Sequence, residues 1–373
     1  MTPWQVYVRN AALETVGAVD VWEQLRAELR VNAGGNWSIT MPSTAEQAQL
    51  LAEGSGVVVW GPAGVVFSGP MRSPERSRDD DGQATLVATG IDDTARLGFR
   101  LCYPDPTAIS TAQTEESHYV ATGPAETVIR NLINVNAGPG ALTARRIAGL
   151  TLEADEARGA TVRCEARFSN LLEECAELAR IGGIRFWIEQ DGEQLRLRFT
   201  EPVEGRARFS VGMGNLAAHD WKLTAPGATR VLVAGQGDLT ERQFVERADT
   251  DAEEAWGERI EVFQDARDTD ENTTHEQRGD AVLAEAAGTG GLSSTPVDVP
   301  GLAFGLDYNL GDVAEVDLGD VTVTDTIAQI SIEGDASGVR VKPIVGGTDP
   351  DAPALYKHFR QLRARTDKLE RSK

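Results

Sequence analysis

Two distant stretches of this chain repeat the same succession of short strands and turns, and this repetition constrains the fold more than any other feature. Residues 57–90 and 313–346 are equally long. Each is expected to form a strand, a glycine-containing turn, a strand, a longer strand, an acidic glycine turn and a final strand. Because residue identity between the two is low, a true duplication and a chance convergence of two β meanders both remain open.

Alternation of apolar and polar residues predicts antiparallel β structure over the first ~100 residues. The clearest example pairs residues 25–31 with residues 37–41 across a turn-forming cluster at 32–36. Its apolar positions are Leu25, Ala27, Leu29, Val31, Trp37, Ile39 and Met41. These side chains would form one buried face of a sheet.

Helical periodicity enters between the two β-rich regions. One helix is expected after Pro124, and a second is expected between a Ser169 cap and a stop at Gly182 and Gly183. Asp191-Gly192 lies between alternating runs, which is typical of a hairpin. The predicted fold is therefore α+β but mainly β. The predicted domains are a first β-rich domain (1–104), an α+β insertion domain (105–200), a second β-rich domain (201–349) and a C-terminal basic amphipathic helix (350–373).

The C-terminal segment differs from the rest of the chain in charge. From residue 355 onward it holds seven basic and two acidic residues, whereas the whole chain carries a formal net charge of -22. Its apolar positions follow a heptad-like spacing with one polar member. They are Leu355, Phe359, Leu362 and Leu369, with Thr366 between the last two. Because ~12 to 15 residues are needed for even a marginal isolated helix, this segment needs a partner. Either identical helices of an oligomer or its own domain could serve.

Composition limits the partners and the compartment. The negative charge and a pI of about 4.6 disfavour stable nucleic-acid binding. No apolar run approaches the ~18 residues of a membrane span, and no signal peptide is visible. The three cysteines, Cys102, Cys164 and Cys175, show no CxxC spacing, so neither a disulfide framework nor a zinc site is expected.

The sequence nominates no catalytic, cofactor-binding or metal-binding residue. The four histidines lie far apart and form no metal-binding pair. Asp268, Asp270 and Asn272 match the opening of a calcium-binding loop, but Thr273 stands where glycine is needed. The tryptophans are spread along the chain, which suits cores better than a sugar-binding platform. They include Trp22, Trp37, Trp60, Trp187, Trp221 and Trp256.

Several short phrases together resemble the siphophage tail-tip or baseplate hub (minor tail protein) family of actinobacterial phages. Each phrase is weak alone, and their order along residues 1–349 makes the match specific. The phrases are Gly64–Pro70 followed by Gly90–Asp93, Leu101–Pro106, Leu171–Glu173 followed by Phe186–Ile188, and Arg259–Asp268 followed by Phe304–Asp312.

This resemblance implies two β-barrel-like hub domains, an α+β insertion and assembly into a homotrimer at the virion tail tip. Three subunits with two similar barrels each would match a six-fold tail tube. The implied partners are a distal tail protein or the tail tube, a tape-measure protein, and tail fibre or receptor-binding proteins. Leu355, Phe359, Leu362 and Leu369 would then form an oligomer or partner interface. A receptor- or carbohydrate-binding tail module and a cell-wall hydrolase remain the alternatives.

Overall fold

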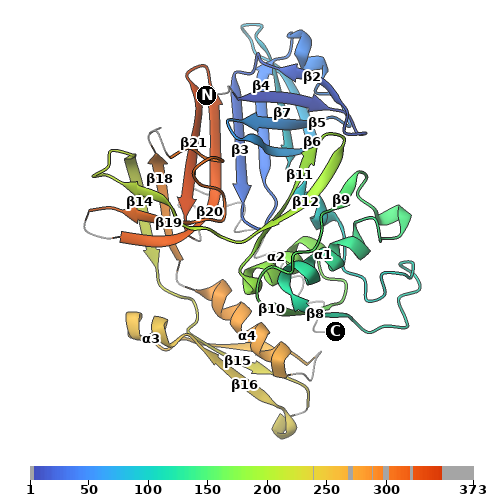
Figure 1. The fold of residues 1–373 in the computed structure, drawn as a ribbon, viewed down its shortest axis with the longest axis vertical. Helices are drawn as coiled ribbons and strands as arrows, with labels where there is room; N and C mark the ends of the chain where they lie inside the picture. The colour runs from blue at the N-terminus through green and yellow to red at the C-terminus, as the bar shows by residue number, and fades with distance from the viewer. Residues whose placement is uncertain are drawn as a thin grey trace.

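A continuous, mainly antiparallel sheet runs through most of the protein in the computed structural model (Figure 1). The structure describes residues 4–237, 239–267, 272–287, 289–296, 302–319 and 322–346. Within them the main sheet has 13 strands, which come from both ends of the chain. We call its N-terminal part, residues 5–91, the first module, and its C-terminal part, residues 204–224 with 289–345, the second module.

The first module forms because its strands alternate between buried and exposed side chains. Leu25, Ile39 and Met41 are fully buried, and residues 24–30 pair with residues 36–42 as the periodicity predicts. Between β4 and β5 the chain forms a single 3-10 turn with Ala45 at its N-cap and no side-chain cap. The elements are β1 (Gln5–Arg9), β2 (Thr15–Val19), β3 (Gln24–Arg30), β4 (Asn36–Pro42), η1 (Glu46–Gln49), β5 (Gly56–Gly61), β6 (Gly64–Arg78) and β7 (Ala84–Ile91).

The second module repeats five strands of this order. The first module runs β1-β5-β6-β7-β4-β3, and the second runs β13-β19-β20-β21-β18-β14. The edge strand differs, since β1 is antiparallel to β5 while β13 is parallel to β19. The elements are β13 (Glu204–Ser210), β14 (Leu216–Thr224), β18 (Thr289–Pro296), β19 (Val313–Asp317), β20 (Thr322–Asp335) and β21 (Gly338–Val345).

The likeness extends to the irregularities of the long middle strands. β6 pairs with β5 up to Pro70 and with β7 from Met71, while β20 pairs with β19 up to Thr326 and with β21 from Ile327. The register then shifts by one residue directly after Met71 in one module and after Ile327 in the other. The repetition that the sequence suggested is therefore present in strand pairing as well as in pattern.

The two modules join edge to edge. β3 of the first module pairs antiparallel with β20 of the second, from Arg30 opposite Gln329 to Leu25 opposite Gly334. Both sides contribute to one hydrophobic core, in which Leu25, Ile330 and Ile332 are at most 1% exposed. Figure 1 shows the β20–β21 hairpin standing beside β3.

The two barrels that the resemblance implies are not confirmed in the single chain. Among the described residues no sheet closes into a barrel, and the two modules share one open, mainly antiparallel sheet. The physical reason lies in the junction, because β20 pairs with β3 of the other module on the edge that closure would require.

The chain between the modules forms an α+β unit with its own core. Its helices α1 and α2 pack together around Ile129, Leu132 and Cys175, all of which are fully buried. Asn170, one residue beyond the predicted Ser169, caps α2, and Gly183 ends it with φ 68° as expected. The elements are η2 (Thr94–Phe99), β8 (Tyr119–Pro124), α1 (Ala125–Asn136), η3 (Thr143–Arg145), β9 (Leu150–Leu152), β10 (Thr161–Ala166), α2 (Leu171–Gly182), β11 (Arg185–Asp191) and β12 (Gln194–Thr200).

A smaller unit, which the predicted domain boundaries do not separate from the second domain, lies between β14 and β18 in the chain. We call residues 227–287 the peripheral unit, and Figure 1 shows it below the main sheet. Its core is small, with Val231 and Val233 buried beneath one helix. Its sheet order is β16-β15-β17. The elements are β15 (Arg230–Ala234), η4 (Leu239–Glu241), β16 (Phe244–Ala248), α3 (Thr250–Trp256), β17 (Glu261–Asp265) and α4 (Asn272–Ala286).

Candidate functional site

The interface residues predicted from sequence cannot be placed. Leu355, Phe359, Leu362 and Leu369 lie outside the described residues. Asp268 and Asp270 of the sequence that resembles a calcium-binding loop also lie outside them. The geometry of a functional site therefore has to come from the two modules and the units attached to them.

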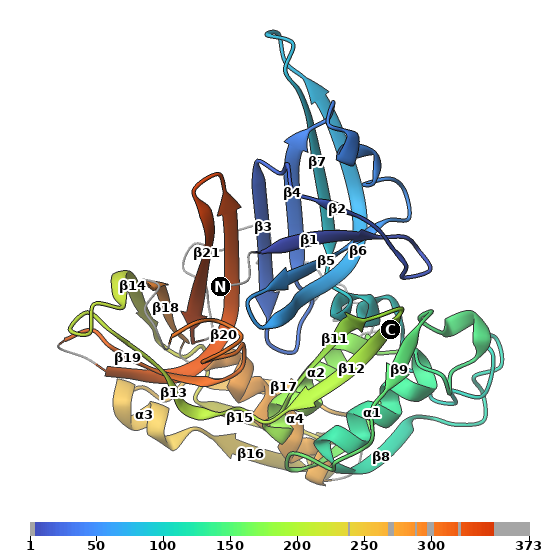
Figure 2. The same cartoon turned by 45° about the horizontal axis from the view of Figure 1, so that its top comes forward.

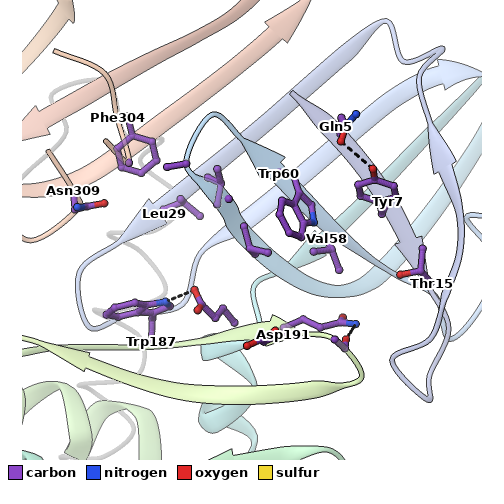
Figure 3. A pocket seen from close by; sticks show the side chains of 18 of the residues that line it. Gln5, Tyr7, Thr15, Leu29, Val58, Trp60, Trp187, Asp191, Phe304 and Asn309 are labelled. Carbon is purple, nitrogen blue, oxygen red and sulfur yellow. Dashed lines mark hydrogen bonds between the residues drawn. The ribbon is translucent and has the colours of Figure 1, made fainter. Parts of the chain in front are cut away.

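A pocket of about 800 Å³ opens where both modules meet the α+β unit. Strands β1, β5 and β6 form one wall, the β11–β12 hairpin forms another, and the loop at 304–309 closes the third side (Figure 3). Since three parts of the chain contribute, the pocket exists only when they are assembled.

Four aromatic side chains, Tyr7, Trp60, Trp187 and Phe304, line this pocket. Trp60 on β5 is 43% exposed, and Figure 3 shows it with Tyr7 on one side and Trp187 on the other. Phe304 lines the side that the second module supplies. The expectation that the tryptophans serve cores holds for Trp37, which is 2% exposed, but Trp60 and Trp187 share a surface pocket. Spacing could not reveal this pair, because they come from different units.

The carboxylates of the pocket are already engaged. Glu189 accepts hydrogen bonds from the Trp187 indole N–H at 2.9 Å and from the Arg198 Nε at 2.9 Å. Asp191 pairs with Arg196 at 3.1 Å. Because both acids serve as structural acceptors, neither is poised as a free general acid or base.

Arg185 ties the pocket wall to the second module. Its guanidinium stacks over the Trp187 ring at 4.2 Å and donates a 2.8 Å hydrogen bond to the Leu310 carbonyl. Burial lowers the pKa of Arg185 to about 10, with Asp312 and Glu189 acting in the opposite direction. The side chain therefore remains cationic at neutral pH and favours an electron-rich aromatic neighbour.

A buried polar cluster behind the pocket joins the first module to the β11–β12 hairpin. Arg9 makes a two-pronged ion pair with Asp93, at 2.7 and 2.8 Å, and donates to the Gln190 side chain at 2.7 Å. Ser68 donates to Asp93 at 2.6 Å and accepts the Gln190 backbone N–H at 2.8 Å. Arg9 and Asp93 are 2% and 0% exposed, so this ion pair is fully shielded from water.

Asn32 provides a second grip on the same strand. This residue lies in the β3–β4 turn with φ 51°, a left-handed conformation that Asn tolerates. Its amide donates to the Ile184 carbonyl at 2.9 Å and accepts the Phe186 N–H at 2.8 Å. Together with the Arg9 cluster it fixes β11 against the first module.

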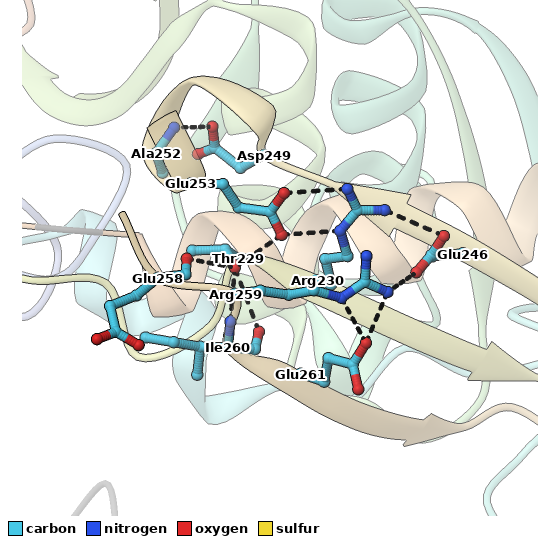
Figure 4. Close-up of polar contacts among 10 residues, drawn as sticks. All are labelled: Thr229, Arg230, Glu246, Asp249, Ala252, Glu253, Glu258, Arg259, Ile260 and Glu261. Carbon is cyan, nitrogen blue, oxygen red and sulfur yellow. Dashed lines mark hydrogen bonds and ion pairs between the residues drawn. The ribbon is translucent and has the colours of Figure 1, made fainter. Parts of the chain in front are cut away.

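The peripheral unit is held by surface ion pairs. Figure 4 shows Arg230 between Glu253 and Glu246, and Arg259 between Glu246 and Glu261. Hydrogen bonding to Arg230 lowers the pKa of Glu253, which keeps this carboxylate ionised. Asp249 caps α3 by accepting the Ala252 N–H at 2.9 Å. The network ties β15, β16, β17 and α3 into one body.

The described residues contain no other assembled chemistry. No group of three or more His, Cys, Asp or Glu side chains among them could hold a metal ion. Burial raises the pKa of the Cys102 thiol to about 12 and raises those of Cys164 and Cys175 as well. Such thiols are poor nucleophiles. None of the described helices has the length and apolarity to cross a membrane.

Comparisons with known proteins agree with a tail origin. Residues 5–347 match the family described as siphovirus ReqiPepy6 Gp37-like protein. No curated protein matches the sequence. Among solved structures, the 43 kDa tail protein of prophage MuSo2 from Shewanella oneidensis is similar, with a TM-score of 0.60 at 12% identity, covering 93% of this chain and 99% of that one.

Two further tail proteins share the fold. Prophage tail protein gp18 from Listeria monocytogenes EGD-e has a TM-score of 0.57 at 10% identity, covering 96% of this chain and 98% of that one. The tail protein from Neisseria meningitidis MC58 has a TM-score of 0.57 at 13% identity, covering 92% and 97%. At these identities the likeness concerns the fold, which extends over nearly the whole chain in each case.

Proposed function

This chain belongs to the siphovirus ReqiPepy6 Gp37-like protein family, and on that premise we propose that it is a structural hub subunit of a phage tail tip and not an enzyme. Three copies form a ring between the tail tube with its distal tail protein above and the host-facing components below. The tape-measure protein and the tail fibre or receptor-binding proteins are the further partners.

The repeated module carries this proposal. Each chain contains two modules of similar strand order, which pair through β3 and β20 within one sheet. Three chains would present six similar modules around an axis, which is what a six-fold tube above a three-fold tip requires. The barrel-like domains of the hub hypothesis would then arise only in the assembled ring, where neighbouring copies cover the open edges.

The chemistry of the described residues supports a structural role. The polar clusters hold units together, and the pocket carboxylates are paired. We assign residues 1–104 and 201–349 to hub domains, with the peripheral unit inserted in the second, and residues 105–200 to a domain at the ring's periphery. The segment 350–373 is proposed to dock on its counterparts or on the next component, through Leu355, Phe359, Leu362 and Leu369.

Mass in solution tests this proposal. We expect light scattering across a concentration series to reveal a species of three subunits of 40.1 kDa, and negative stain to show a ring. A wall-degradation assay on the same sample serves as the control for hidden enzymatic activity. A strict monomer together with wall degradation would overturn the proposal in favour of a hydrolase.

A second candidate function rests on the aromatic pocket. Trp60 is 43% exposed and lines the pocket together with Trp187, and an exposed indole can stack on a sugar ring, so a receptor- or carbohydrate-binding tail module remains a competing proposal. Binding of host cell-wall glycans, measured by calorimetry, should disappear in Trp60→Ala if this function holds. Absence of glycan binding in the unaltered protein would remove this candidate.

A further inference from the structure

We propose that neighbouring copies of this chain join by pairing the β6 edge of one copy with the β14 edge of the next, in the register of the internal β3–β20 junction. This inference rests on the proposed ring and names the strands that form it. It commits to one occupant for both open edges, a second copy of the same chain.

Both edges are open in the single chain. The second half of β6, Met71–Arg78, pairs with β7 but with no other described strand, and residues 72–78 are exposed. Figure 2 shows the hairpin of β6 and β7 projecting beyond the rest of the protein. At one end of the sheet, β14 pairs with β18 but with no other described strand. Unpaired edges expose rows of N–H and C=O groups that readily bind another strand.

The internal junction supplies the template. In the second module the strand equivalent to β6 is β20, and its outer edge is covered by β3. In the second module the strand equivalent to β3 is β14. The β6 edge and the β14 edge are therefore equivalent to the two edges that pair within the chain, and both are left open. Because a β6 edge meets a β14 edge, the contact is head-to-tail, and repetition of it produces a ring or an open helix.

The register follows from matching rungs of the two modules. In the first module a rung runs from Ser73 through Thr89 and Ser38 to Arg26. In the second module the equivalent rung runs from Gln329 through Ile344 and Ser293 to Asp220. Arg26 and Asp220 therefore hold equivalent positions.

Applying the β3–β20 pairing to β14 of one copy and β6 of the next then gives the residues that lie opposite each other. Arg26 lies opposite Glu333, and Glu28 lies opposite Ser331. By equivalence, Asp220 of one copy lies opposite Ser77 of the next, and Lys222 lies opposite Glu75.

The residue types at these positions agree with the register, although they played no part in deriving it. Lys222 and Glu75 have opposite charges, and directly opposed opposite charges stabilise an antiparallel pair. Trp221 lies opposite Arg76, a combination of aromatic and cation. A shift by one residue would place Lys222 opposite Arg76 and lose both matches.

Pro74 limits the ladder at one position. The Val31 N–H donates to the Ala328 carbonyl at 3.1 Å, so hydrogen-bonded pairs alternate from there and include Leu29 with Ile330. Pro74 holds the position in the first module that is equivalent to Ile330 in the second. Because proline has no N–H, the junction between copies has one backbone hydrogen bond fewer than the internal junction. Such a proline also disfavours unrelated strands at this edge.

Disulfide cross-linking tests the register. Lys222 and Glu75 form a pair without mutual hydrogen bonds, in which Cα atoms lie about 4.5 Å apart, within the range that a disulfide accepts. The native cysteines Cys102, Cys164 and Cys175 are buried, so they do not compete. On mild oxidation, the variant carrying both Glu75→Cys and Lys222→Cys should form covalent oligomers. A mixture of the two single variants should give covalent dimers and nothing larger.

Two controls flank this variant. Glu28→Cys with Ser331→Cys places the same pair in the internal junction, so its disulfide should form within one chain without a change of mass. Arg76→Cys with Lys222→Cys shifts the register by one and should not cross-link. As an independent readout, Glu75→Lys should abolish association seen by light scattering, and adding Lys222→Glu should restore it.

The outcomes separate this inference from the proposed function. A trimer by light scattering without the Glu75–Lys222 cross-link overturns the inference and leaves the hub proposal in place. Cross-linked species that continue beyond three subunits support the edge pairing and contradict the closed trimer. A monomer that forms no cross-link at the highest concentration overturns both.

Discussion

The buried ion pair between Arg9 and Asp93 makes a strong prediction about how the units stay together. Replacing Asp93 with alanine removes the acceptor of both guanidinium hydrogen bonds and of the Ser68 hydroxyl. Arg9 keeps the Gln190 side chain as a neutral acceptor but loses its counter-charge. Breaking a buried pair in this way costs about 3 to 5 kcal/mol of unfolding free energy.

Urea unfolding followed by circular dichroism measures this cost. A domain with a typical stability of about 5 to 15 kcal/mol should still fold after such a loss, with a clearly lower midpoint. Asp191→Ala is the matched control. Asp191 pairs with Arg196, whose side chain is 38% exposed, so its removal should cost less than about 1 kcal/mol.

A double variant distinguishes the burial of charge from the loss of packing. Arg9→Met combined with Asp93→Leu removes both charges and should recover part of the stability lost in Asp93→Ala. If Asp93→Ala loses no more than the Asp191→Ala control, the ion pair does not hold the hairpin to the first module and this reasoning is refuted.

Three other predictions follow from burial and from the C-terminal segment. Burial raises the pKa of Asp92 from 3.8 to about 6, so its protonated form favours the folded state, and stability contributed below pH ~4 is lost as the pH rises through ~6. That contribution is about 3 kcal/mol at 1.36 kcal/mol per pKa unit. The Asp92→Asn variant should lose this dependence of unfolding free energy on pH in urea titrations, and an unchanged dependence on pH would contradict the prediction. The thiols of Cys102, Cys164 and Cys175 should resist iodoacetamide in the folded protein and react fully in urea, as mass spectrometry can check, whereas rapid labelling of the native protein would argue against their burial. Truncation after Pro350 should leave the folded modules intact by circular dichroism but weaken trimerisation or loading of the next component, and Leu362→Asp with Leu369→Asp should act alike; unchanged assembly would show that the segment is dispensable.

Local signals in the sequence were sufficient for individual elements. Helix α2 and its Gly183 stop follow from apolar spacing and from a backbone conformation that favours glycine. The β11–β12 hairpin follows from Asp191-Gly192 between alternating runs. The cap was misplaced by one residue because Ser169 and Asn170 are both good capping residues, and only Asn170 reaches the Leu172 and Glu173 N–H groups.

The periodicity of the sequence does not predict which distant strands pair with each other. Nothing in residues 25–30 indicates that residues 329–334 lie beside them, because any alternating strand offers the same backbone edge. The peripheral unit is not separated from the second domain in the sequence, because its core is small and its surface is rich in ion pairs such as Arg230 with Glu253. The Arg9 cluster was missed because Arg9, Asp93 and Gln190 are single polar residues of unrelated segments.

The β3–β4 turn of the first module is equivalent to the β14–β18 connection of the second, but the two differ in what they contact. This difference indicates where the protein tolerates an insertion. The β3–β4 turn is short, and its Asn32 is occupied by the backbone of β11 at Ile184 and Phe186. At the corresponding position, between β14 and β18, the chain instead carries the whole peripheral unit. New sequence can therefore be inserted at the second turn without a change to the sheet, whereas an insertion at Ala33 would disturb one of the two anchors that hold β11 to the first module.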